Sequence, residues 1–139
     1  MEFLHTCYRI GDIDRSVAFF RGLGFEFDPR FTDEKATCML VGEDAYVMLL
    51  REPFFKEFLG RPMANAHEAT ECIVAFSAAS KGEVDEIVGK ALATGGSKAL
   101  DPKDLGFMYS GSFYDPDGHY WEVVWMDVDA FMKATGKAA

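Results

Sequence analysis

The sequence lacks any long apolar run, and this lack argues against a membrane-spanning helix. No stretch of the 139 residues approaches the roughly 20 consecutive apolar residues that such a helix requires. The first residues also lack the basic and apolar regions of a secretory signal. We therefore expect a cytoplasmic protein that makes no membrane contact.

Cysteine is scarce, and basic residues form no cluster. Cys7, Cys38 and Cys72 are odd in number and widely spaced, which is neither a disulfide framework nor a zinc-ribbon spacing. We expect reduced thiols in a reducing compartment. The formal net charge of −9 and the missing Lys/Arg cluster argue against nucleic acid as a partner. At long range this charge favours a cationic ligand over an anionic one, or it serves solubility alone.

The sequence instead contains one arrangement twice: a strand, a capped helix, a glycine stop and three further strands. Residues 3–10 are predicted to form the first strand, and Asp12 offers an N-cap to a helix whose apolar residues recur at helical spacing. In the second half a strand is predicted at residues 72–76, and Ser80 with Glu83 has the spacing of a capping box. Glycines follow both predicted helices and end them.

Each half is predicted to close with a hairpin. Strands at residues 37–41 and 45–50 flank the first turn, and strands at residues 107–114 and 120–126 flank the second. The second turn, residues 115–118, reads Asp-Pro-Asp-Gly, where proline fixes φ and glycine takes a positive φ.

The predicted fold class is therefore α+β, with two βαβββ modules forming a curved mixed sheet around a cleft. The first module with its connector covers residues 1–65 and the second covers residues 66–139, so that the chain forms a single domain overall. One helix per module leaves one face of the sheet without a helix. We expect that face to form the cleft and to bind a small molecule.

Two stretches resemble a known family. Residues 4–27, LHTCYRIGDIDRSVAFFRGLGFEF, are similar to the opening of glyoxalase I and its relatives. Residues 113–127, FYDPDGHYWEVVWMD, are similar to the closing hairpin of the same superfamily, the vicinal oxygen chelate proteins. The chain is identified as a member of the glyoxalase/bleomycin resistance/extradiol dioxygenase superfamily, most similar to bacterial proteins that resemble lactoylglutathione lyase. This resemblance implies the two-module fold and a homodimer.

The resemblance also implies where a metal ion would lie. In the metal-using members, the first and last strand of each half supply four ligands to a divalent ion. His5 and Glu122 match two of these positions, whereas the other two hold Met48 and, depending on the alignment, Cys72 or Ile73. Two protein ligands would hold Zn, Ni, Fe or Mn weakly, so the implied cofactor is a divalent metal or none.

Strand parity predicts which side chains face the cleft. Glu122 shares one strand face with Tyr120, while Trp121 and Val123 share the other face, which is suited to packing against a helix. Glu122 then points into the cleft, or it forms a structural ion pair with Arg9. The side chains that we expect to contact a substrate are Met48, Cys72, Met108 and Tyr120.

Two functions stay open. A lyase or isomerase resembling lactoylglutathione lyase would use a metal on His5 and Glu122 to polarise vicinal oxygens, with Glu122 as the catalytic residue that moves the proton. A binding protein resembling the bleomycin-resistance type would instead sequester a cationic drug in a cleft without metal. Extradiol ring cleavage ranks below both, because only one strand histidine is placed for a two-histidine, one-carboxylate site.

Overall fold

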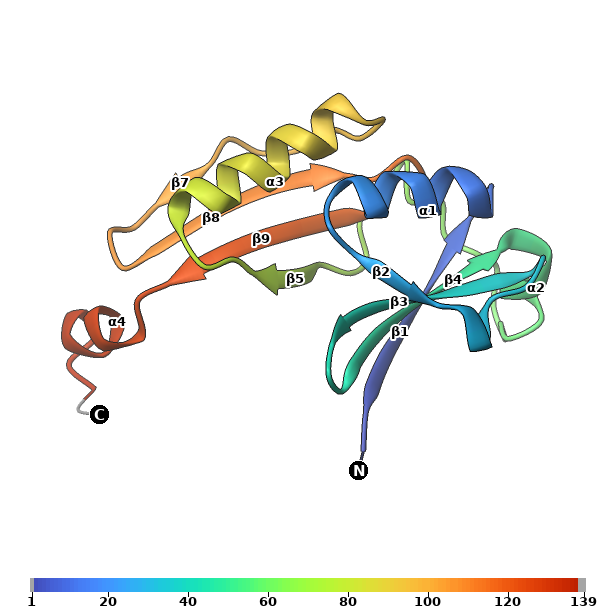
Figure 1. Ribbon diagram of the computed structural model, residues 1–139, viewed down its shortest axis with the longest axis horizontal. Coiled ribbons are helices and arrows are strands. Elements are labelled where there is room, and N and C mark those ends of the chain that lie inside the picture. The colour runs from blue at the N-terminus through green and yellow to red at the C-terminus, as the bar shows by residue number, and fades with distance from the viewer. Residues whose placement is uncertain (1, 138–139) are drawn as a thin grey trace. The chain divides into compact units, whose positions relative to one another are not determined.

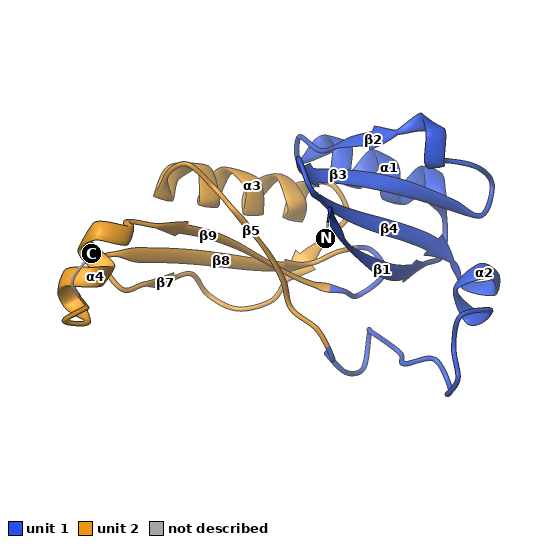
Figure 2. Ribbon diagram, turned by 90° about the horizontal axis from the view of Figure 1, so that it is seen from below, with its two compact units in different colours: residues 1–71, 116–119 blue, residues 72–115, 120–139 orange. Residues whose placement is uncertain are grey.

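The computed structural model describes residues 2–137, which form two compact units (Figure 2). Unit 1 comprises Met1–Glu71 and Pro116–His119, and unit 2 comprises Cys72–Asp115 and Tyr120–Ala139. The short segment 116–119 therefore joins two strands of unit 2 while it packs in unit 1. No helix among the described residues is long and apolar enough to cross a membrane.

Unit 1 consists of one main helix on a mixed four-stranded sheet (Figure 1). The sheet order is β1-β4-β3-β2, with β1 parallel to β4 and the other neighbours antiparallel. Its elements are β1 (Leu4–Ile10), α1 (Ile13–Gly22), β2 (Glu26–Asp28), a 3-10 turn (Pro29–Phe31), β3 (Ala36–Gly42), β4 (Ala45–Arg51) and α2 (Glu52–Lys56).

Unit 2 repeats this plan with a five-stranded sheet. The order is β5-β9-β8-β6, β7 also pairs with β8, and β5 runs parallel to β9. Its elements are β5 (Val74–Ser77), α3 (Lys81–Ala93), β6 (Ser97–Lys98), β7 (Lys103–Asp104), β8 (Met108–Tyr114), β9 (Tyr120–Met126) and α4 (Val128–Ala134). The predicted α+β class with βαβββ modules is confirmed, and the strands are hydrogen-bonded as two sheets, one in each unit.

The helix ends follow the local signals in the sequence. Asp12 caps α1 by accepting a hydrogen bond from the Arg15 amide at 3.0 Å. Ser80 caps α3 by accepting from the Glu83 amide at 3.1 Å, and the Glu83 carboxylate accepts from the Ala79 amide at 2.6 Å. Glycines with a positive φ, Gly24 at 103° and Gly95 at 113°, follow the two helices.

The start of the first strand of unit 2 was predicted two residues too early. The strand expected at residues 72–76 is observed as β5, Val74–Ser77, so that Cys72 and Ile73 precede it. Cys72 is exposed and Ile73 is 60% exposed. An apolar run alone does not distinguish a buried strand from an exposed apolar segment that leads into it.

In each unit the core lies between the helix and one face of the sheet. Phe19 and Phe20 of α1 are buried in unit 1. In unit 2, Trp121 and Val123 are fully buried on the face of β9 that α3 covers, as strand parity predicts (Figure 1). Residues at alternate positions of these strands therefore lie on the opposite face.

Candidate ligand-binding faces

His5 lies on the face of the unit 1 sheet opposite α1. It is exposed, pairs in register with Tyr46 on β4, and stacks against Phe3 with ring centroids 5.7 Å apart. Phe3 in turn meets the Tyr46 ring edge-on at 5.8 Å. The imidazole therefore lies in an aromatic group at the start of β1, where an apolar molecule or a cation could stack.

Met48 lies one step further along the same face. In register it stands between Cys7 on β1 and Cys38 on β3. Burial raises the pKa of both thiols above the ordinary cysteine value. Thiols with a raised pKa stay protonated at neutral pH, so Cys7 and Met48 present a soft, uncharged surface, while Cys38 is buried beside them.

Glu122 occupies the corresponding face of unit 2. It lies on β9 between Ala75 on β5 and Ser112 on β8, opposite the face that α3 covers. The side chain is half-buried, and no described residue of unit 2 gives its carboxylate a hydrogen bond or an ion pair. A half-buried carboxylate without a protein partner is suited to a cationic or hydrogen-bonding ligand.

The other predicted contact residues divide into two groups. Met108 on β8 and Tyr120 on β9 are half-buried and share the face of Glu122 by strand parity. Tyr120 meets the Tyr114 ring edge-on at 5.7 Å. Cys72, in contrast, is exposed and lies outside the β5–β9 ladder.

The internal repeat decides which residue is equivalent to His5. His5 lies seven residues before the cap Asp12 (12 − 5), and Ile73 lies seven before the cap Ser80 (80 − 73). The strand registers agree, because Cys7 pairs with Met48 as Ala75 pairs with Glu122. Ile73, not Cys72, is therefore the counterpart of His5, and Met48 is the counterpart of Glu122.

This assignment allows a test of the metal that the family resemblance implies. Only His5 and Glu122 offer donors suited to Zn, Ni, Fe or Mn, because Met48 has a weak thioether and Ile73 has no donor at all. Among residues 2–137, no group of three or more His, Cys, Asp or Glu side chains is placed to hold a metal ion. The residues at the four positions do not fit a divalent ion.

A buried group at the second hairpin turn was missed from the sequence. Asp117 is 3% exposed, and its Oδ1 accepts from the Gly11 amide at 2.9 Å and from Arg15 Nη2 at 2.7 Å. Its Oδ2 accepts from the Ser16 hydroxyl at 3.3 Å. His119, two residues after Asp117, stacks on Tyr8 with ring centroids 4.1 Å apart. The turn residues were predicted from their φ preferences, which carry no information on partners this distant in sequence.

The comparisons with known proteins show the family through a family model and the fold through solved structures. The model of the family described as Glyoxalase/Bleomycin resistance protein/Dioxygenase superfamily matches residues 2–123. No curated protein matches the chain. Among solved structures, hypothetical protein SA1046 from S. aureus has a TM-score of 0.76 at 22% identity, over 89% of this chain and 93% of that one.

Two further structures extend the comparison. A glyoxalase-related enzyme from Fulvimarina pelagi has a TM-score of 0.74 at 20% identity, over 89% of this chain and 87% of that one. The fosfomycin resistance protein FosX from Listeria monocytogenes, solved with Mn(II) and sulfate, has a TM-score of 0.69 at 21% identity, over 96% of both chains. At these identities the likeness concerns the fold, and the chemistry has to be argued from the residues themselves.

Proposed function

This chain belongs to the Glyoxalase/Bleomycin resistance protein/Dioxygenase superfamily, and from that premise we propose that it binds a small cationic molecule without a divalent metal ion. The residues that we assign lie on the sheet faces opposite α1 and α3. They are His5, Tyr46 and Met48 in unit 1 and Met108, Tyr120 and Glu122 in unit 2. The homodimer that the resemblance implies belongs to this proposal, and sedimentation analysis of the purified chain would check it.

One observation supports the proposal: Met48 and Ile73 are the residues that the internal repeat assigns to two of the four positions at which the family resemblance implies metal ligands. FosX is a relative solved with Mn(II), so metal binding occurs within the superfamily. Metal-dependent lyase or isomerase chemistry needs an ion held tightly enough to polarise the substrate. The weak thioether of Met48 and the hydrocarbon side chain of Ile73 leave two of the four positions without a suitable donor for that ion.

Charge and side-chain chemistry support a cationic ligand. The formal net charge is −9, which raises the concentration of cations near the protein. Glu122 has no partner among the described residues of its unit, and a bound cation would supply one. Methionine and aromatic side chains on the same faces supply apolar contact for the rest of the molecule.

The metal part of the proposal is tested by metal analysis of tag-free protein. We expect wild type to contain no stoichiometric divalent ion, even after dialysis against Mn, Fe(II), Ni and Zn. The double variant Met48→Glu with Ile73→His restores ligand types at both lost positions and is expected to bind about one ion per chain. An ion in wild type that is lost in His5→Ala would overturn the proposal. A double variant without metal would contradict the assignment of Met48 and Ile73 as the lost positions.

The ligand part is tested by calorimetry with a panel of cationic drugs in the presence of a chelator. Glu122→Gln keeps the shape of the side chain and removes its charge, and we expect it to weaken binding of the best ligand by about tenfold or more. The matched control is Glu57→Gln, which removes one exposed carboxylate elsewhere in the chain. Equal weakening in both variants would show that only the net charge matters and would contradict a role for Glu122.

A further inference from the structure

The two main helices approach their sheets differently. In unit 2, α3 packs on Gly111, where an added Cβ would lie 2.9 Å from Val88 Cγ2 and 3.1 Å from Val84 Cγ1. The counterpart of Gly111 in unit 1 is Thr37. In unit 1, Thr37 on β3 pairs with Leu49 on β4, and Leu49 pairs with Tyr8 on β1. In unit 2, Gly111 on β8 pairs with Val123 on β9, and Val123 pairs with Phe76 on β5. A threonine therefore stands where a close helix contact needs glycine.

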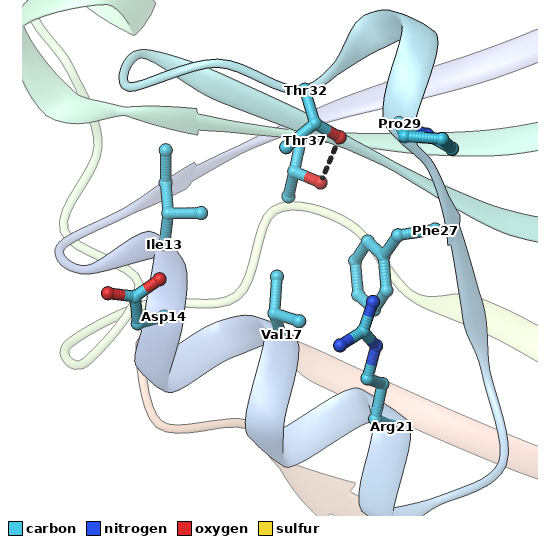
Figure 3. Close-up of a pocket in the computed structure, with 8 residues that line it drawn as sticks. All are labelled: Ile13, Asp14, Val17, Arg21, Phe27, Pro29, Thr32 and Thr37. Carbon is cyan, nitrogen blue, oxygen red and sulfur yellow. Dashed lines mark hydrogen bonds between the residues drawn. The ribbon is translucent and has the colours of Figure 1, made fainter.

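A cavity of about 460 Å³ lies between α1 and this part of the unit 1 sheet. Figure 3 shows Ile13 and Val17 rising from α1 toward Thr37, with Phe27 of β2 beside Arg21 at one end. This volume is within the range of small-molecule sites, and the central walls are apolar. The cavity is on the helix-covered face of the sheet, which is the face opposite Met48.

Opposite charges mark the two ends of the cavity. Asp14 and Arg21 line it from the same helix, seven residues apart, which is about two turns or 10 Å along the axis. The Arg21 guanidinium lies over the Phe27 ring at 5.8 Å. Neither charged side chain has a hydrogen bond or an ion pair with any residue in the described range 2–137.

Two hydrogen-bonded threonine side chains, Thr32 and Thr37, form the sheet side of the cavity. Thr32 Oγ1 donates to the Asp28 carbonyl at 2.8 Å, so the 2.9 Å contact between the two threonine hydroxyls is donated by Thr37 (Figure 3). Thr37 is fully buried, so this pair of hydroxyls closes the sheet side of the cavity. The Asp14 carboxylate, which is exposed, is the group that meets an ammonium group.

We propose that this cavity binds a zwitterionic amphiphile: an ammonium group toward Asp14, a carboxylate toward Arg21, and an apolar chain over Val17 and Phe27. The spacing of about 10 Å between the helix positions of Asp14 and Arg21 is close to the length of an extended amino acid whose two charged groups are separated by roughly five to seven methylene groups. Such a ligand has no net charge, so the acidic protein does not repel it. This site goes beyond the proposed cationic ligand and lies on the other face of the sheet, so the failure of either proposal leaves the other standing.

The test is a comparison of matched probes against the full chain by NMR titration and calorimetry. The probes are 6-aminohexanoate and 8-aminooctanoate, with hexanoate and hexylamine as singly charged controls. We expect the zwitterions to bind at least about tenfold more tightly than either control, with shift changes at residues of α1 and β2. Equal affinity for all probes, or no binding at millimolar concentration, would overturn the proposal.

Two variants locate the binding. Val17→Trp fills the cavity and is expected to abolish binding. Arg21→Gln is a surface change that preserves the fold, and it is expected to remove the preference for the zwitterion over hexylamine. Lys90→Gln is the matched control, because Lys90 is the basic residue in the last turn of α3, as Arg21 is in α1, and it pairs with Glu86 at 3.1 Å. An unchanged preference in Arg21→Gln, or an equal loss in Lys90→Gln, would overturn the proposal.

Discussion

Units 1 and 2 follow the same chain plan but differ on both faces of their sheets. On the helix side, α3 touches Gly111, whereas Thr37 of unit 1 lines a cavity beneath α1. On the opposite face, unit 1 has His5 on its first strand and Met48 on its last strand. Unit 2 has Ile73 just before its first strand and Glu122 on its last strand. Each unit therefore keeps one side chain suited to a metal ion: His5 on the first strand of unit 1 and Glu122 on the last strand of unit 2. The comparison shows that caps, glycine stops and strand parity maintain the fold while positions on either face change.

The largest expected effect comes from giving unit 2 the residue of unit 1. Gly111→Thr places a branched side chain where even a Cβ would lie 2.9 Å from Val88 Cγ2. Overpacking of this kind costs about 1–3 kcal/mol, occasionally more, and we expect the upper end because valine methyl groups on a helix have little freedom to move. Urea unfolding of the purified variant measures the loss.

The control for Gly111 is a glycine of the helix that packs on it. Gly89 of α3 is exposed, and a Cβ built there meets nothing within 4 Å. Gly89→Ala is therefore expected to stabilise the protein by about 0.5–1 kcal/mol, the opposite sign. If Gly111→Thr were as stable as wild type, the close contact between α3 and β8 would not be needed, and the comparison with Thr37 would lose its basis.

The parts of this comparison that rest on local signals were predictable from the sequence. The caps Asp12 and Ser80 and the face of Trp121 follow from neighbouring residues and from the two-residue period of a strand. The count back from the two caps distinguishes Ile73 from Cys72, and the register of β5 against β9 agrees with that count. The cavity under α1 depends on a helix–sheet distance, and no sequence period encodes that distance.

The hairpin turns differ between the repeats, and this difference gives a second prediction. The turn at residues 42–44 is exposed, whereas Asp117 is buried and accepts hydrogen bonds from Gly11, Arg15 and Ser16. Asp117→Asn removes the charge from these bonds and turns an amide N–H₂ toward donors. Hydrogen bonds to charged groups contribute about 1.5–3 kcal/mol, so we expect a loss of about 2 kcal/mol in thermal or urea unfolding.

The control for Asp117 is another aspartate that lies on the surface. Asp101 is paired with Lys98 at 2.5 Å, and both side chains are largely exposed. Exposed ion pairs contribute little, so Asp101→Asn should change the free energy of unfolding by less than about 1 kcal/mol. Similar losses in the two variants would show that the burial of Asp117 is unimportant, and they would count against its role in holding the start of α1.

The smallest expected effect concerns the hydrogen bond between Tyr109 and Asp85 of α3. This hydrogen bond is exposed, whereas Asp117, which accepts hydrogen bonds at the start of α1, is buried. The Tyr109 hydroxyl of β8 donates to the Asp85 carboxylate at 2.6 Å, and this hydrogen bond raises the pKa of Tyr109 above its ordinary value of 10.0. The folded chain thus keeps a proton that the unfolded chain loses above about pH 10, so this stabilisation is complete at lower pH and falls as pH rises.

In Asp85→Asn we expect the pKa of Tyr109 to return toward the ordinary tyrosine value, with almost no change in stability at neutral pH. A tyrosine-selective NMR titration follows the ionisation, and Asp104→Asn serves as the control because Asp104 contributes only a minor Coulombic part of the shift. A pKa that moves equally in both variants, or in neither, would show that the hydrogen bond to Asp85 is not the cause.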